Sequence, residues 1–181
     1  MATWALFLRG VNVGGNCSLP MKDLVALLEQ HGCKNVRTYI QSGNAVFEGT
    51  KAVATRVAKQ LGAAIRKKRG FEPRLHLISL AELEAAAAAN PYTRAAATEP
   101  RLLHVFFLSG QPGPADIDAM NAARASHEEF TLQGKHFYLH TPRGFGTSKL
   151  AASALKHLGK DCTARNWRTL TAMLDLARGA R

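Results

Sequence analysis

The chain has 181 residues, of which 46% are hydrophobic, so it can bury a globular core as one domain or two small ones. Its 24 lysine and arginine residues outnumber 13 aspartate and glutamate residues, and the formal net charge of +11 favours anionic partners without identifying any of them. Three well-separated cysteines, the lack of a long apolar run and seven scattered histidines argue against a disulfide scaffold, a membrane span and a metal site.

The first half of the chain predicts six elements. An apolar strand ends at Arg9, a helix capped by Ser18 with Pro20 in its first turn stops at Gly32, and two strands form a hairpin about residues 41–43. The predicted ranges are strands 4–9, 35–40, 44–49 and 73–80, and helices 19–31 and 51–69. The order βαββαβ is that of a split-βαβ or ferredoxin-like unit.

Residues 81–101 are interpreted as a connector between two subdomains. Their first half suits a helix that the pair Asn90-Pro91 ends, and their second half is polar and rich in alanine. We predict an N-terminal subdomain of residues 1–80 and a C-terminal subdomain of residues 102–181 on either side of this connector.

The second half repeats the same order of elements without visible sequence identity. The predicted ranges are strands 102–108, 129–133, 135–141 and a short one around 161–165, and helices 114–125, 148–158 and 166–177. Alternation along these strands predicts one sheet face that carries His104, Phe106, His136, Tyr138 and His140. The predicted fold class is α+β, with two ferredoxin-like (split βαβ) subdomains built on antiparallel sheets.

Polar and glycine residues of two loops are predicted to converge at one edge of the first sheet. The first and third strands of a βαββαβ unit are adjacent and antiparallel, so the end of one lies beside the start of the other. Glycines with exposed N–H groups, a helix N-terminus and an arginine suit a phosphate or another small anion, although glycine and asparagine also dominate ordinary turns. The candidate ligand-binding residues are Arg9, Asn12, Gly14, Gly15, Gln41, Ser42 and Asn44.

A second cluster of basic and capping residues lies in the last 40 residues of the chain. Ser148 and Asn166 are predicted helix caps, which explains them without a ligand. Cations near a helix start are mildly unfavourable, and an anionic ligand or a salt bridge would compensate for them. The second candidate cluster is Arg143, Ser148, Lys149, Arg165, Asn166 and Arg168.

The residues do not decide between a binding protein and an enzyme, and two other functions stay open. The net charge and the alternating aromatic and histidine face of the second sheet favour a nucleic-acid-binding protein. The cations at 66–69 also suit nucleic acid, but cations are favoured at a helix C-terminus for electrostatic reasons alone. A structural or partner-binding module needs neither candidate site. The cysteine content predicts a cytoplasmic location, and we expect no metal, no cofactor and no membrane partner.

Several segments of the chain resemble one protein family, the uncharacterised bacterial domain-of-unknown-function family 1697. The segments that carry the resemblance are LFLRGVNVGG, PMKDLVALLEQHG and VRTYIQSGNAVF in the first half, and HVFFL, FYLHTPRGFGTSKL and TARNW in the second. The resemblance runs in order through nearly the whole chain. It implies a cytoplasmic α+β protein of two subdomains, and it implies no activity.

Overall fold

The computed structural model describes residues 1–159 and 162–179. The chain divides into two compact units, which are Met1–Ala85 with Thr171–Arg181 and Ala86–Leu170. Residues 160, 161, 180 and 181 lie outside the described part, and so does the start of the strand predicted around 161–165. None of the described helices is long and apolar enough to cross a membrane.

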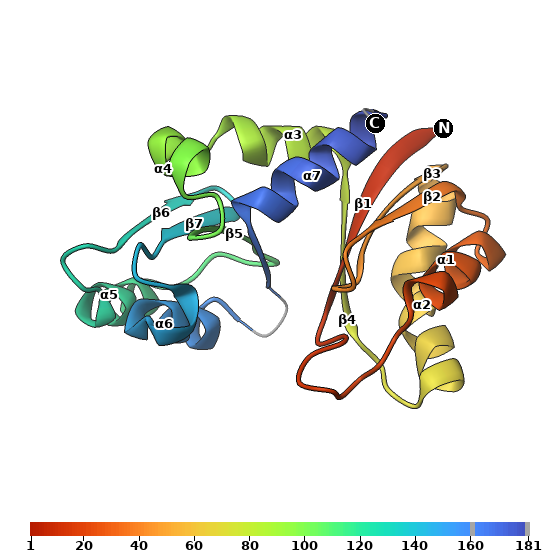
Figure 1. The fold of residues 1–181 in the computed structure, drawn as a ribbon, viewed down its shortest axis with the longest axis horizontal. Helices are drawn as coiled ribbons and strands as arrows, with labels where there is room; N and C mark the ends of the chain where they lie inside the picture. The colour runs from red at the N-terminus through yellow and green to blue at the C-terminus, as the bar shows by residue number, and fades with distance from the viewer. Residues whose placement is uncertain (160–161, 180–181) are drawn as a thin grey trace. The chain divides into compact units, whose positions relative to one another are not determined.

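The first unit contains a four-stranded sheet with the order β2-β3-β1-β4, in which all neighbouring strands are antiparallel. Its strands are β1 (Ala2–Arg9), β2 (Lys34–Tyr39), β3 (Asn44–Gly49) and β4 (Arg74–Ser79). Helices α1 (Met21–Gln30) and α2 (Lys51–Arg69) complete the predicted βαββαβ order. Both helices lie on the same side of this sheet (Figure 1).

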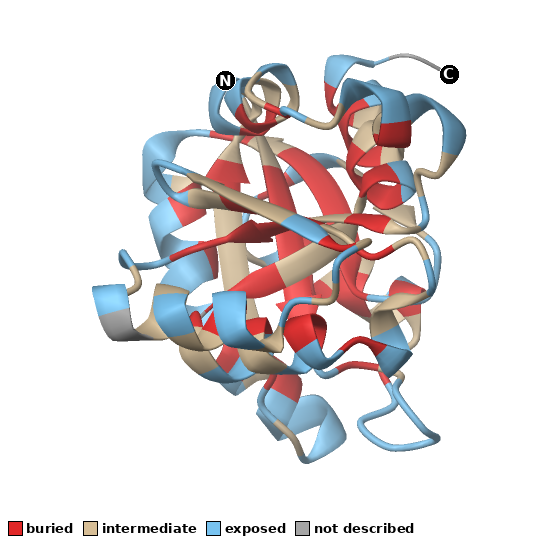
Figure 2. Ribbon diagram, turned by 90° about the vertical axis from the view of Figure 1, so that its left-hand side faces the viewer, coloured by how far each residue is buried: buried red, intermediate tan, exposed pale blue. Residues whose placement is uncertain are grey.

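Each of these helices buries an apolar stripe against the sheet. Leu24 and Leu28 of α1, and Val57, Leu61 and Ile65 of α2, recur at helical spacing and are fully buried. The central strands β1 and β3 behind them are largely buried. Across the molecule, buried residues gather on the strands, whereas the exposed residues lie mainly on helices and loops (Figure 2). Burial of this stripe is therefore what holds α1 and α2 against the sheet.

Helix α1 begins three residues after the predicted cap. Pro20 is its N-cap, with extended backbone angles and no capping side chain, so the prediction that Ser18 caps this helix is wrong. The physical reason lies in the preceding loop, because the Leu19 N–H donates to Oδ1 of Asn12 at 2.8 Å. That bond holds the chain at Leu19 outside the helix and delays the first turn.

The second unit repeats the first in topology, with the strand order β6-β7-β5-β8 and antiparallel neighbours throughout. Its strands are β5 (Leu103–Phe107), β6 (Glu129–Gln133), β7 (His136–His140) and β8 (Thr163–Asn166). Helices α5 (Pro114–Ala123) and α6 (Lys149–His157) pack on one face, and a short 3₁₀ turn η1 (Phe145–Thr147) precedes α6. Two further helices, α3 (Leu80–Ala88) and α7 (Trp167–Arg178), run across the division between the units.

The register of the second sheet corrects the predicted aromatic face. Residues directly opposite in an antiparallel pair share a face, and Phe106 lies opposite Phe137 while His104 lies opposite Leu139. His104 and Phe106 therefore lie on the face covered by α5 and α6. His136, Tyr138 and His140 lie on the opposite face. The prediction of one face with all five aromatic and histidine residues is wrong, because alternation within a strand does not set the phase between two strands.

A short helix, α4 (Thr93–Thr98), forms in the second half of the predicted connector. Three consecutive alanines, which have the highest helix propensity, explain its formation. Ala95 is buried, so this helix packs on the second unit. The helix brings polar residues of the connector onto the surface of that unit, where they line a pocket.

Candidate functional site

The first predicted site contains a small hairpin that explains its two central glycines. Val13 and Asn16 form an isolated antiparallel bridge, and the Asn16 N–H donates to the Val13 carbonyl at 3.0 Å. Gly14 and Gly15 between them have φ of +59° and +78°, the pattern of a type I′ turn. No heavy atom lies within 4 Å of a Cβ added at either glycine, so the turn geometry alone requires them.

Asn12 joins this hairpin to the turn between β2 and β3. Its Nδ2 donates to the Gln41 carbonyl at 2.6 Å and to the Leu19 carbonyl at 2.9 Å, while its Oδ1 accepts from the Leu19 N–H. The two loops therefore meet, as the strand order predicts. The amide of Asn12 is occupied by these three backbone groups, so its role here is to hold the loop.

The remaining residues of the first candidate set have different surroundings. Asn44 is fully buried and its Nδ2 donates to the Tyr39 carbonyl at 3.3 Å, whereas Gln41 and Ser42 are exposed in the turn. Arg9 lies at the end of β1, directly opposite Arg74 of β4. These contacts give a structural reason for the two asparagines, and ligand binding at this edge of the sheet stays a prediction.

Half of the second candidate cluster lines a pocket of about 420 Å³ in the second unit. Arg143 and Lys149 reach it from either end of η1, and Ser148 is the N-cap of α6, with its Oγ accepting from the Ala151 N–H at 2.9 Å. Arg124 and His127, which follow α5, line the same pocket. Four basic side chains from two separate segments therefore surround one hollow.

The turn after α5 is held by hydrogen bonds between its own side chains and backbone. Oε2 of buried Glu128 accepts from the Ala125 N–H at 3.1 Å, and the Arg124 guanidinium donates to the Glu128 carbonyl at 3.2 Å. Glu128 is the one acidic residue lining the pocket within the described part of the chain. Its carboxylate is directed to the turn, so the four basic groups outnumber the acids here.

The other half of the second cluster does not line this pocket. Asn166 caps the first turn of α7 through a 2.9 Å bond from the Thr169 N–H, as predicted. Arg165 donates to Oγ1 of Thr163 at 3.0 Å, and burial lowers the pKa of its guanidinium to about 10. Arg168 is exposed in the same turn of α7. These three residues belong to β8 and the start of α7 rather than to the basic pocket.

The cations at 66–69 are mostly paired with acids. Lys68 and Arg69 both form ion pairs with Asp23, and Arg66 forms one with Glu72 at 3.2 Å. The Arg69 and Lys68 contacts lower the pKa of Asp23, with burial opposing them. The run therefore stabilises the C-terminal end of α2 and its neighbours, which accounts for it without nucleic acid.

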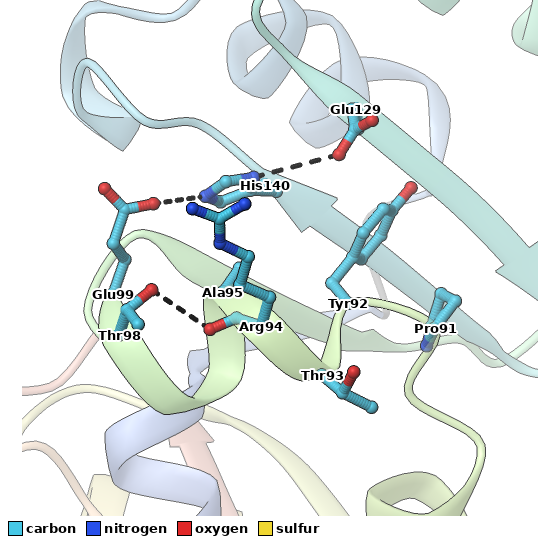
Figure 3. Close-up of a pocket in the computed structure, with 9 residues that line it drawn as sticks. All are labelled: Pro91, Tyr92, Thr93, Arg94, Ala95, Thr98, Glu99, Glu129 and His140. Atoms are coloured by element: carbon cyan, nitrogen blue, oxygen red, sulfur yellow. Dashed lines mark hydrogen bonds and ion pairs between the residues drawn. The ribbon is translucent and has the colours of Figure 1, made fainter.

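A larger pocket of about 860 Å³, also in the second unit, was not predicted from the sequence (Figure 3). Tyr92, Arg94 and Glu99, from the predicted connector, line one side of it, and Glu129 and His140 line the other. The feature of the sequence that could have indicated these lining residues is the grouping of polar residues beside the alanines of 93–98. Within residues 1–159 and 162–179, no three histidine, cysteine or acidic side chains are placed to hold a metal ion.

Comparisons with known proteins agree with this architecture. A solved structure of a conserved bacterial protein from Streptococcus pneumoniae is 21% identical in sequence and superposes with a TM-score of 0.74, covering 97% of this chain and 98% of that one. At that identity the likeness establishes the fold alone. No curated protein matches the chain. A family described as "Protein of unknown function (DUF1697)" matches residues 1–138, and the chain therefore belongs to the DUF1697 family.

Proposed function

We propose that this protein binds a small anionic ligand, carrying a phosphate or carboxylate group, in the basic pocket of the second unit. The observation that supports the proposal is the set of four basic side chains around one hollow, Arg124, His127, Arg143 and Lys149. Within the described residues none of the four forms an ion pair. Glu128 is the one acid among the described residues of the lining, and its carboxylate is bonded to the turn, so the cations repel one another and a bound anion removes that repulsion.

The chemistry of these side chains selects the ligand class. The planar guanidinium groups of Arg124 and Arg143 bind two oxygens of a phosphate or carboxylate side by side, and Lys149 adds a point charge. The first turn of α6 contributes partial positive charge from its N–H groups. At about 420 Å³ the pocket lies within the range of small-molecule sites. Two charge-assisted hydrogen bonds at a partly open site give a dissociation constant on the order of 1 mM or lower for a simple anion.

We therefore assign the anion to the second predicted cluster and not to the first predicted site. The Asn12 amide is occupied by backbone groups, whereas Arg143 and Lys149 are exposed and have no ion pair within the described residues. The distribution of available cations therefore favours the basic pocket.

The test is an NMR titration of the full-length protein with inorganic phosphate and with pyrophosphate at constant ionic strength. We expect saturable shifts of the amides of residues 144–150, and at least about fivefold weaker binding in Arg143→Gln and Lys149→Gln. Lys156→Gln, at the opposite end of the same helix, is the matched control and should bind like the wild type. Equal binding by Lys149→Gln and Lys156→Gln would show that general charge, and not the pocket, attracts the anion. A short RNA that shifts these amides in place of the small anions would favour the nucleic-acid alternative.

A further inference from the structure

The larger pocket shares no lining residue with the basic pocket and has a different charge pattern. It lies between α4 with the residues before it and the ends of β6 and β7. Arg94 supplies one positive charge, and Glu99 and Glu129 supply two negative charges (Figure 3). In a chain with a net charge of +11, a pocket with more acids than fixed cations is not explained by the overall composition.

His140 is held at the centre of the acidic side chains. Its Nε2 lies 2.9 Å from Oε2 of Glu99, and its Nδ1 lies 4.0 Å from Oε2 of Glu129. Glu129 and His140 are direct cross-strand partners, so they share one face of the sheet. The imidazole side chain is only 13% exposed, and the Tyr92 ring lies 6.3 Å from it. The geometry fixes the ring between two carboxylates at unequal distances.

The unequal distances assign the tautomer of the neutral ring. An ionised carboxylate only accepts hydrogen bonds, so the 2.9 Å contact to Glu99 requires the proton on Nε2. The neutral ring then has its lone pair on Nδ1, on the side of Glu129. Nδ1 and Oε2 of Glu129 lie 4.0 Å apart, beyond hydrogen-bond distance, and in the neutral ring both are acceptors without a donor between them. They are correctly spaced for one donor group, because a tetrahedral ammonium spans acceptors about 4 to 5 Å apart with hydrogen bonds of ordinary length.

Arg94 supplies a complementary charge in the same pocket. Figure 3 shows its guanidinium beside the imidazole, on a different side from Glu129. Arg94 is exposed, and within the described part of the chain it forms no ion pair. The Tyr92 hydroxyl is held by Oγ1 of Thr131 at 2.8 Å, which keeps the tyrosine ring in place as an apolar wall. A ligand that matches this pocket has an ammonium group for Glu129 and His140 and an anionic group for Arg94.

We propose that this pocket binds a small zwitterion of the amino-acid class, with its ammonium between Nδ1 of His140 and the carboxylate of Glu129 and its carboxylate on Arg94. Glu99 is a positioning residue, which orients the imidazole and holds the proton on Nε2. The Tyr92 ring contacts the bound ligand from the side.

The experiment is an NMR titration that follows the imidazole signals of His140 in the full chain. The probes are individual free amino acids, ethylamine as the ammonium alone and acetate as the carboxylate alone, each to about 10 mM. We expect at least one amino acid to shift the His140 signals to saturation, and ethylamine and acetate each to bind at least about tenfold more weakly. No saturable shift with any amino acid would overturn the proposal, as would ethylamine binding as tightly as the amino acid.

Three variants test the placement of the two charged groups. Glu129→Gln should weaken both the amino acid and ethylamine at least about fivefold, whereas Arg94→Gln should weaken the amino acid and leave ethylamine unchanged. Both side chains are exposed, so their replacement leaves the core intact. Asp118→Asn, an exposed acid on α5, is the matched control and should bind as the wild type does. Unchanged amino-acid binding in either pocket variant would contradict the proposed orientation. Loss of phosphate binding in Lys149→Gln without any change at His140 distinguishes this site from the basic pocket.

Discussion

Replacing His104 by glutamine should make the second unit less sensitive to acid. His104 lies on β5, and the centre of its ring is 4.2 Å from that of Phe145. Burial lowers the pKa of the imidazole to about 4, against a smaller opposing effect of the Leu102 backbone. Its Nδ1 is buried and has no hydrogen bond of normal geometry within the described residues. The folded protein therefore holds this side chain neutral in mildly acidic solution.

The magnitude follows from the two pKa values of His104. Because the folded-state pKa of about 4 lies below the ordinary value of 6.5, the unfolded chain binds a proton first as the pH falls. Stability is complete above the unfolded pKa and is lost as the pH falls from about 6.5 toward 4. The loss between about pH 7.5 and pH 5 is about 2 kcal/mol, and the total loss at lower pH is about 3 kcal/mol.

Urea unfolding at these two pH values tests this prediction. Trp167 is buried in the second unit, and its emission reports that unit when Trp4 is replaced by phenylalanine. Between the two pH values the parent should lose about 2 kcal/mol more unfolding free energy than His104→Gln does. His31→Gln, in the first unit, is the control and should keep the parental dependence of Trp167 emission. An equal pH dependence in His104→Gln and its parent, or an NMR titration midpoint of His104 near 6.5, would refute the reasoning.

Four further substitutions test the loop contacts and the second core by urea unfolding. Gly43→Ala should destabilise the first unit by about 2 to 4 kcal/mol, because φ is +70° and the new Cβ would lie 2.6 Å from a Val11 methyl group. Gly14→Ala, in open space, should cost only about 1 kcal/mol, and an equal cost of the two would contradict the packing argument. Asn12→Ala should cost the first unit about 2 kcal/mol through its lost bonds to the backbone, and an unchanged midpoint would show that these bonds are dispensable. Tyr138→Phe should cost the second unit about 1 to 2 kcal/mol, because it removes a buried 2.7 Å hydrogen bond to a backbone carbonyl; full stability would contradict that.

Local signals were sufficient to predict most of the fold. Helix α2 occupies the predicted range because Thr50 caps its start and Gly70, at φ +80°, ends it. The hairpin between β6 and β7 likewise turns at Gly134, the one residue between the two predicted strands 129–133 and 135–141. Two features were not predicted correctly: which residues of paired strands share a sheet face, and the residue at which α1 begins. The pairing of β5 with β7 depends on contacts between segments distant in sequence, and the delayed start of α1 depends on a side-chain bond from Asn12 within the preceding loop.

The candidate sites depend still more on such distant contacts. Strand order correctly brought the hairpin of residues 12–17 to the turn at 41–43, but the sequence does not reveal that Asn12 would use its amide to hold the two together. Arg143 and Lys149 could be recognised because they flank a helix start. Arg124 was not recognised, since it reaches the basic pocket only through the packing of α5 beside α6.

Calorimetric titration of two matched double variants with pyrophosphate tests the anion proposal most directly. Arg143→Gln/Lys149→Gln removes two charges at the basic pocket, and Lys135→Gln/Lys156→Gln removes two exposed charges elsewhere on the same unit. If the pocket binds the anion, the first variant loses at least about 20-fold in affinity and the second binds like the wild type. Equal weakening of both variants, or no binding by the wild type at about 10 mM, would contradict the account.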